Sequence, residues 1–434
     1  MYSSLKFKPI SISLSPNVQK DDVALACKML FLPLAWKRGG GIKKLEEEFK
    51  KYLGVKYAVS FNSGRSSLYA ILKALGLPKQ SDVLLQAFTC NAVVNPILWA
   101  DLHPIYIDCA DDFNIDTKKL ALLIRENKQC EVLIIQHTFG LAANMDELMK
   151  IAKENNLIVI EDCAHALGAE FNGQKVGIFG DAAFFSFSRD KVISSVYGGM
   201  AVTNNDEIGR ILRQAQDKFG QPPLFWVFQQ IIHPILLYIL ILPLYHFFDL
   251  GKIFLVLSQW LHILSKAVSW QEKQGKRPDY FPKALPNALA VMALCQFKKL
   301  DVFNNHRQRL ADFYYENLKD TKFGLPKKPF GSAQGGDGNI FLRFAITHPK
   351  AHEILYDAWY KENILLGDWY TSVIAPDDTQ LDKMQYRQGL CPNAEYLAKK
   401  TLNLPTHINI SLRPRLGQAI SDAQRIADFL KKYQ

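Results

Sequence analysis

Residues 132–165 read VLIIQHTFGLAANMDELMKIAKENNLIVIEDCAH, and this stretch decides the fold class. Two short apolar runs, Val132–Ile135 and Leu157–Ile160, flank the segment MDELMKIAKENN, whose apolar residues recur at helical spacing. An apolar strand, a helix and a second apolar strand are typical of a parallel sheet that helices cover on both faces. The stretch therefore predicts an α/β fold.

The same alternation extends toward the N-terminus. Residues 42–53 carry an apolar stripe at helical spacing, and Gly54 is expected to end that helix. Strands are expected at Tyr57–Phe61, Asp82–Leu85 and Ile105–Ile107, with helical segments between them. We therefore expect the α/β fold to cover the first 200 residues.

The second half of the chain predicts a smaller α+β domain that closes over the first. A long helix is expected over Leu285–Asn317. Further strands and helices are expected at Phe341–Ile346, 350–361, 392–400, Ile408–Ser411 and 416–432. We divide the chain into a large domain of residues 1–305 and a small domain of residues 306–434.

Composition narrows the class of protein. Of 434 residues, 48% are hydrophobic and 22% are charged, which excludes disordered, collagen-like and disulfide-scaffold proteins. The seven cysteines show no CxxC spacing and predict buried thiols in a reducing compartment. The N-terminus lacks the long apolar core of a secretory signal, so we expect a cytoplasmic protein. The net charge of +10 comes with no nucleic-acid motif, and we expect neither a nucleic acid partner nor a metal site.

Candidate site residues follow the ends of the expected strands, where ligands of open α/β sheets bind. The turn at residues 62–66, NSGRS, starts a helix, and its backbone N–H groups and helix dipole suit a phosphate. Taken alone, the turn is more typical of an ordinary Ser-Gly turn with a helix cap. Asp162 and His165 follow the strand Leu157–Ile160. A carboxylate there can hold a proton on a ring nitrogen, or it can simply cap the next helix.

A lysine follows a further strand. The strand Ala182–Phe187 carries Ser186, and Lys191 lies in the turn beyond it. A lysine beside a buried strand can lose its proton through desolvation and attack a carbonyl group, although most turn lysines lie on the surface. We assign no role to His137. A phosphate turn, a carboxylate, a hydroxyl and a lysine in this order are what pyridoxal phosphate requires.

With these motifs in place, the sequence resembles the sugar aminotransferases of the DegT/DnrJ/EryC1/StrS family, which have the type I fold of pyridoxal-phosphate enzymes. The matching segments, in chain order, are GGGIKKLEEEF, VSFNSGRSSL, QAFTCNAVVNPI, HTFGLAANMDEL, IEDCAHALGAEFNGQKVGIFGDAAFFSF, the turn at Lys191, CPNAEYLAKKTLNLPTH and ISLRP. The resemblance implies that Lys191 binds the cofactor covalently. It also implies that the cofactor contacts Asp162 at the pyridine nitrogen, His165 near the 3-hydroxyl, Cys90 at the ring, and Ser186, Ser63, Gly64 and Arg65 at the phosphate.

The resemblance further implies a transamination in two steps. An amino acid, commonly glutamate, would give its amino group to the cofactor, which would pass it to a keto sugar on a nucleoside diphosphate for a surface polysaccharide. It also implies a homodimer with active sites at the subunit interface. The alternative is a catalytically silent sensor or scaffold of the same fold that is attached to the membrane.

Four features depart from the family pattern. Arg65 stands where the family usually has Thr, and Tyr197 stands where it usually has Glu. Asn287 is the nearest candidate for the family's asparagine that reaches the neighbouring subunit's phosphate, but its register does not fit. The fourth departure is an apolar insertion at residues 221–270.

This insertion has only two charged residues, Asp249 and Lys252, between Gln221 and Ser265. Leu224–Phe248 has the length of a spanning helix, but the fold excludes a single crossing because Lys191 and the closing domain must lie on one side. A helical hairpin, a shallow re-entrant dip and an interfacial helix pair remain, beside an insertion buried at the dimer interface.

We favour membrane contact, which would place the protein at the inner face of the membrane. Basic residues flank the insertion and would face anionic headgroups. They are Arg210, Arg213, Lys218, Lys266, Lys273, Lys276 and Arg277.

Overall fold

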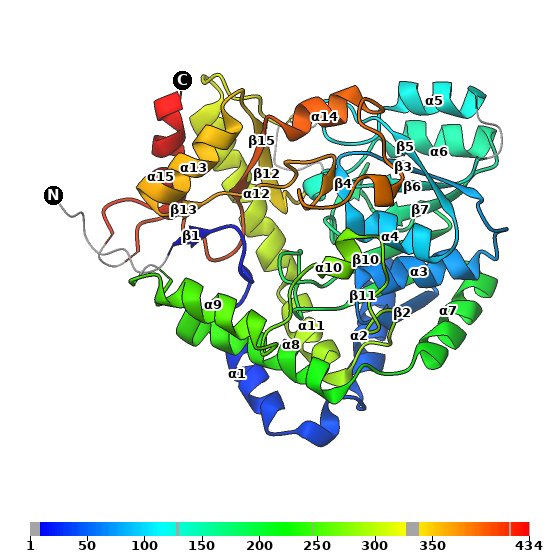
Figure 1. Cartoon of the computed structure of the whole chain (residues 1–434), viewed down its shortest axis with the longest axis horizontal. Coiled ribbons are helices and arrows are strands. Elements are labelled where there is room, and N and C mark those ends of the chain that lie inside the picture. Colours follow the sequence, from blue (N-terminus) through cyan, green and yellow to red (C-terminus); the bar gives the residue numbers. More distant parts are fainter. Residues whose placement is uncertain (1–8, 127–129, 246, 327–337, 416–417, 434) are drawn as a thin grey trace.

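The central element is a seven-stranded sheet of the order β2-β11-β10-β7-β6-β3-β5 (Figure 1). The computed structural model describes residues 9–126, 130–245, 247–326, 338–415 and 418–433. The strands are β2 (Tyr57–Phe61), β3 (Asp82–Gln86), β5 (His103–Ile107), β6 (Cys130–Gln136), β7 (Ile158–Asp162), β10 (Ala182–Ser186) and β11 (Gly199–Thr203). Within this sheet β11 runs antiparallel to both neighbours, and the other pairs are parallel. The predicted α/β class is confirmed.

Helices cover both faces of the sheet, and strand β6 shows why its sequence is apolar throughout. Val132 and Ile134 pack on one face in the same cluster as side chains of α3 (Gly64–Ala74) and α4 (Asn91–Trp99). Leu133 and Ile135 point to the other face. They pack there with side chains of α5 (Thr117–Glu126) and α6 (Met145–Glu154).

Local sequence patterns predicted the bounds of the first elements to within a residue or two. Helix α2 spans Gly41–Leu53, and Gly54 ends it in the left-handed conformation with φ 72°, as predicted. The predicted helix over Leu285–Asn317 is wrong in one respect. It is two helices, α11 (Asn287–Phe297) and α12 (Leu300–Leu318). No breaker residue marks the junction, where Lys299 forms ion pairs with Asp21 and Asp22 of α1 (Lys20–Leu30).

The C-terminal part contains a two-stranded antiparallel sheet of β12 (Arg343–Thr347) and β15 (Thr401–Pro405). Its helices are α13 (Ala351–Glu362), α14 (Pro392–Ala398) and α15 (Asp422–Leu430). The strand predicted at Ile408–Ser411 is wrong, because those residues form a turn in which Asn409 donates hydrogen bonds to the carbonyls of Pro16 and Val18.

One predicted boundary lies outside the described residues, and another falls inside a helix. Residues 416–417 of the helix expected at 416–432 lie outside the described residues. The division between residues 1–305 and 306–434 falls inside α12, and we retain it as a proposal.

The insertion forms a helix pair on the surface, next to α1 (Figure 1). Its elements are α8 (Leu224–Leu236), η3 (Leu237–Ile241), α9 (Leu250–Trp260) and α10 (Trp270–Lys273). Among the described residues, Leu224–Ile241 is the one helix long and apolar enough to cross a membrane, and half of it is buried. Trp226, Val227 and Ile231 pack it into the same cluster as residues of α1 and α11. The first segment is therefore part of the protein core rather than a projecting hairpin.

Candidate active site

A cavity lies at the carboxyl ends of the parallel strands, where ligands of open α/β sheets bind. All eight residues singled out from the sequence line it: Ser63, Gly64, Arg65, Cys90, Asp162, His165, Ser186 and Lys191. They come from segments far apart in the chain, and the strand ends bring them together. The cavity also has walls that the sequence did not indicate, among them Gln136, Arg189, Ala267, Val268, Trp369 and Tyr370.

The start of α3 forms one end of the cavity. Ser63 caps the helix, and its hydroxyl accepts a hydrogen bond from the Ser66 amide at 3.0 Å. Gly64 packs closely here, because a Cβ atom at this position would lie 3.1 Å from the Cβ of Ser186. Glycine is required at position 199, where a Cβ atom would lie 2.5 Å from the Gly64 nitrogen. This cap leaves the positive end of the helix dipole beside the cavity, which suits an anion.

Asp162 is a buried carboxylate at the end of β7. Its side chain is 3% exposed and accepts a hydrogen bond from the Ala164 amide at 2.9 Å. Burial raises the pKa of Asp162 to about 6, against which the Ala164 hydrogen bond and the charge of Lys191 act. The group is thus close to its titration point near neutral pH, as expected of a functional carboxylate rather than a helix cap.

Lys191 lies inside the cavity, not on the surface. Burial lowers the pKa of Lys191 to about 8, so a substantial fraction of the amine is neutral at physiological pH. Its Nζ atom lies 4.7 Å from the centre of the Trp369 ring. Asn17 donates a hydrogen bond to the Lys191 carbonyl at 2.7 Å and fixes the turn. A neutral, positioned amine is what attack on a carbonyl group requires.

Aromatic rings of the C-terminal part form the wall opposite Asp162. Trp369 stacks on His165, with ring centres 5.3 Å apart and planes 19° apart. His165 accepts the Phe139 amide proton at Nδ1, and its Nε2 lies 3.5 Å from the Tyr370 hydroxyl. Burial keeps the pKa of His165 well below its usual value, so the ring is neutral. Behind Trp369, the Arg343 guanidinium lies 3.4 Å from the ring centre.

Cys90 has a different local role from the ring contact that the resemblance implies. Its Sγ atom caps α4 by accepting a hydrogen bond from the Ala92 amide at 3.5 Å. Burial raises the pKa of Cys90, so the thiol stays protonated and contributes a small apolar surface to the cavity. The aromatic surface in the cavity comes instead from Trp369 and Tyr370.

Two arginines stand beside the start of α3. The guanidinium of Arg189 donates to the carbonyl and the hydroxyl of Ser265 at 2.6 and 2.7 Å. Its Nε atom is buried and has no partner among the described residues, so it can still donate to a ligand. Arg65 forms a buried ion pair with Glu272 and donates to the Ala267 carbonyl at 3.2 Å. Its charge is therefore engaged by the chain itself.

The described residues contain one buried cluster with metal-ligand atoms, His137, Glu161 and Cys163. His137 accepts the Ala143 amide proton at Nδ1, so its Nε2 carries the other proton and donates it to Glu161 at 3.2 Å. Glu161 also accepts hydrogen bonds from the backbone amides of Gly177, Phe179 and Gly180. These atoms are committed to one another, and the cluster is structural.

The family model described as "DegT/DnrJ/EryC1/StrS aminotransferase family" matches residues 25–222 and 270–415. The chain belongs to this family. The gap between the two matched parts falls on the helices α8 and α9, so the apolar insertion is an addition to the family fold.

Several curated relatives carry names of sugar aminotransferases. UDP-N-acetyl-3-dehydro-alpha-D-glucosamine 3-aminotransferase of Acidithiobacillus ferrooxidans is 28% identical over 84% of this chain and 82% of its own length. GDP-perosamine synthase of Caulobacter vibrioides is 35% identical, over 40% of this chain. The aligned part of this chain spans about half (47%) of the Caulobacter enzyme.

Solved structures share the fold. PseC of Helicobacter pylori, an aminotransferase involved in the biosynthesis of pseudoaminic acid, superimposes with a TM-score of 0.72 over 98% of this chain and 99% of its own, at 21% identity. The putative sugar aminotransferase Spr1654 of Streptococcus pneumoniae, solved in its PMP form, gives a TM-score of 0.71 over 99% of this chain and 97% of its own, at 17% identity. The fold is that of type I pyridoxal-phosphate enzymes.

The cavity fits the cofactor of this family. Pyridoxal phosphate needs an amine for its aldehyde, an acid for its ring nitrogen and an anion site for its phosphate. Lys191, Asp162 and the start of α3 with Ser63 and Gly64 offer these three in one cavity. The unpartnered Nε of Arg189 adds a donor at the phosphate end.

Proposed function

We propose that this chain is a pyridoxal-phosphate-dependent aminotransferase that transfers an amino group from an amino acid, with glutamate as the donor, to a keto sugar carried on a nucleoside diphosphate. The observation that carries the proposal is a buried lysine with a pKa of about 8 and a buried carboxylate with a pKa of about 6 in one cavity. The names of the curated relatives support the nucleotide-sugar acceptor and a role in polysaccharide biosynthesis.

The residues of the cavity have separate tasks. Pyridoxal phosphate, when bound, supplies an electron sink for the substrate carbon. Lys191 would hold the cofactor through its amine and would move a proton to and from the substrate carbon as general acid and base. Asp162 would favour the protonated pyridine nitrogen through its negative charge. His165, which is neutral, orients the ring, and Trp369 and Tyr370 exclude water.

A panel of nucleotide-linked keto sugars tests the acceptor. Protein loaded with cofactor and glutamate should aminate at least one member of the panel, detected by mass spectrometry of the sugar. Amination of free keto sugars alone would contradict the nucleotide carrier. If the loaded protein shows no reaction with glutamate, the alternative of a silent sensor or scaffold replaces the enzyme.

We propose a homodimer, on the basis of family membership. Asn287 does not serve as the residue that reaches a neighbouring phosphate. Its amide donates to the Ala35 carbonyl at 2.7 Å and accepts from the Gly41 amide at 2.8 Å, which fixes the start of α2 instead. Light scattering on the purified protein should give twice the chain mass of 49.3 kDa.

We also propose that the insertion contacts the inner face of the membrane from the cytoplasm. Only Gly251 of α9 is buried, and large apolar side chains are exposed along this helix and beside it. This apolar face consists of Ile239, Phe248, Ile253, Val256, Leu257, Trp260 and Leu261. Such a helix suits the interface of a bilayer, with its apolar side chains in the acyl region.

The flanking basic residues support this membrane contact less than the sequence indicated. Arg213 forms an ion pair with Glu46, and Lys273 forms one with Asp378, so both charges are engaged within the protein. The apolar face itself therefore supplies most of the expected affinity.

A further inference from the structure

The segment that returns from the insertion to the family fold forms a wall of the cofactor cavity. This closing segment, residues 265–272, follows α9 and includes the start of the short helix α10. Its Ala267 and Val268 line the cavity together with Ser63 and Arg65. The insertion thus has an apolar face outside and a cavity wall inside.

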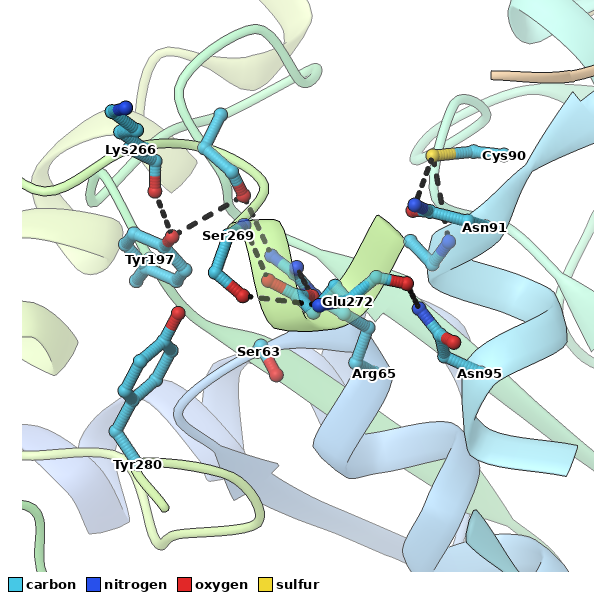
Figure 2. Close-up of polar contacts among 12 residues, drawn as sticks. Ser63, Arg65, Cys90, Asn91, Asn95, Tyr197, Lys266, Ser269, Glu272 and Tyr280 are labelled. Atoms are coloured by element: carbon cyan, nitrogen blue, oxygen red, sulfur yellow. Dashed lines mark hydrogen bonds and ion pairs between the residues drawn. The ribbon is translucent and has the colours of Figure 1, made fainter. Parts of the chain in front are cut away.

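Three buried side chains hold the closing segment by its backbone, as Figure 2 shows for two of them. Arg189 donates to the Ser265 carbonyl at 2.6 Å. The Tyr197 hydroxyl donates to the Lys266 carbonyl at 2.5 Å. Arg65 donates to the Ala267 carbonyl at 3.2 Å and pairs with the Glu272 carboxylate.

Glu272 holds the C-terminal end of the closing segment in place. It is fully buried, and its second carboxylate oxygen accepts the Ser269 amide proton at 2.8 Å. The Glu272 carbonyl accepts a hydrogen bond from Asn95 of α4 at 2.9 Å (Figure 2). The guanidinium of Arg65 also lies 4.6 Å from the centre of the Phe281 ring. A buried ion pair is costly to break from one side, because the remaining charge is left without a partner.

Two of the departures from the family pattern meet at one place. Arg65 and Tyr197, at positions where the resemblance implies Thr and Glu, donate to the carbonyls of Ala267 and Lys266, which lie between the two parts that the family model matches. Each is buried, with exposures of 7% for Arg65 and 1% for Tyr197. A threonine at position 65 could not reach the Glu272 carboxylate with a positive charge. Arg65, Tyr197 and the closing segment thus form one connected set of buried contacts.

We propose that Glu272, through Arg65, is a positioning residue that fastens the closing segment over the phosphate end of the cavity, so that the cofactor leaves only when this segment lifts. This inference rests on the proposed use of pyridoxal phosphate.

The test compares Glu272→Gln with the unchanged protein. The variant should release pyridoxal phosphate about tenfold faster or more, as expected when a charged hydrogen bond is lost. Release is followed by trapping the free cofactor with an excess of an apo-aminotransferase of another kind. Tyr197→Phe, which removes one hydroxyl and no charge, should accelerate release by a smaller factor and serves if Glu272→Gln does not fold.

Glu46→Gln is the matched control. Glu46 of α2 is also a buried carboxylate, and it pairs with Arg213 of α7 (Asp206–Phe219). This ion pair lies outside the cavity lining. This variant should unfold more easily and release cofactor at the unchanged rate. Equal release from Glu272→Gln and the unchanged protein would overturn the proposal. Slower release would also overturn it, because Glu272 would then compete with the phosphate for Arg65.

A second readout needs no cofactor. Lys266 is exposed within the closing segment, and trypsin should cut after it faster in cofactor-free Glu272→Gln than in the cofactor-free unchanged protein. If the unchanged protein binds no pyridoxal phosphate, the proposed function fails, while faster cleavage still supports the fastening by Glu272. Equal cleavage would show that Glu272 does not hold the segment.

Discussion

Single side chains of the cavity oppose the stability of the cofactor-free protein. Burial raises the pKa of Asp162 to about 6 and lowers that of Lys191 to about 8, so the charged form of each group is unfavourable in the fold. Such opposition between function and stability is typical of active sites. A bound cofactor would reduce both costs. Its positive ring nitrogen would lie beside the Asp162 carboxylate, and its bond to Lys191 would replace the free, charged amine.

The pH dependence of stability follows for Asp162. Between pH 3.8 and about pH 6 the folded protein binds the Asp162 proton and the unfolded chain does not. The free energy of unfolding should therefore fall as the pH rises through this window, by about 3 kcal/mol in total from this group. Asp162→Asn should remove this fall, measured by urea unfolding of cofactor-free protein at pH 4 and pH 7. The same fall in Asp162→Asn as in the unchanged protein would refute the assignment, and exposed Asp320→Asn serves as the control.

Most cavity residues at or just beyond strand ends could be predicted from the sequence, whereas the aromatic residues of a distant loop could not. All eight predicted residues line the cavity because the sheet brings its carboxyl strand ends to one edge. Trp369 and Tyr370 lie in a loop without periodicity, so no local pattern indicated them. The partner of Arg65 is 207 residues away, and only the fold reveals that pair.

Among the elements, the two helices of the insertion differ in what holds them. Helix α8 is packed into the core through Val227 and Ile231, both fully buried. Helix α9 buries only Gly251 and exposes the apolar side chains of one face. Hydropathy could not separate them, because both are apolar, and burial depends on contacts with α1 and α11. The unpredicted break between α11 and α12 likewise lies at a tertiary contact, the ion pairs of Lys299 with Asp21 and Asp22.

A pair of matched substitutions tests this difference. Ile231→Ala should lower the free energy of unfolding by about 2–5 kcal/mol, since it leaves a cavity in a packed core. Ile253→Ala on α9, where the side chain is 55% exposed, should change it by less than about 0.5 kcal/mol. Denaturant unfolding in detergent-free buffer measures both. A small effect of Ile231→Ala would mean that α8 is not part of the folded core in solution.

For the molecule as a whole, the insertion separates an inward cavity wall from an outward apolar face. The family fold accounts for residues 25–222 and 270–415, and the face belongs to the part between them. The sequence indicated membrane contact from the length of the uncharged run. In the structure, only α9 and its neighbours support membrane contact, because half of the longest apolar helix is buried.

Vesicle flotation tests the apolar face. The protein should float with vesicles of anionic phospholipid, and replacing Val256 and Trp260 by aspartate together should abolish flotation, because the face would then carry two charges at the bilayer interface. Leu122→Asp, at an exposed leucine on α5, is the matched control and should float normally. If the double variant instead loses only self-association in light scattering, the face is covered by a second copy of the chain.

The central claim is that Lys191 carries an amino-transfer reaction, and a single half-reaction tests it most directly. Protein loaded with pyridoxal phosphate and mixed with glutamate, in the absence of any sugar, should release 2-oxoglutarate in stoichiometric amount while the cofactor takes up the amino group. Lys191→Ala should release none. Release of 2-oxoglutarate by Lys191→Ala at the rate of the unchanged protein, or none by either, would contradict the account.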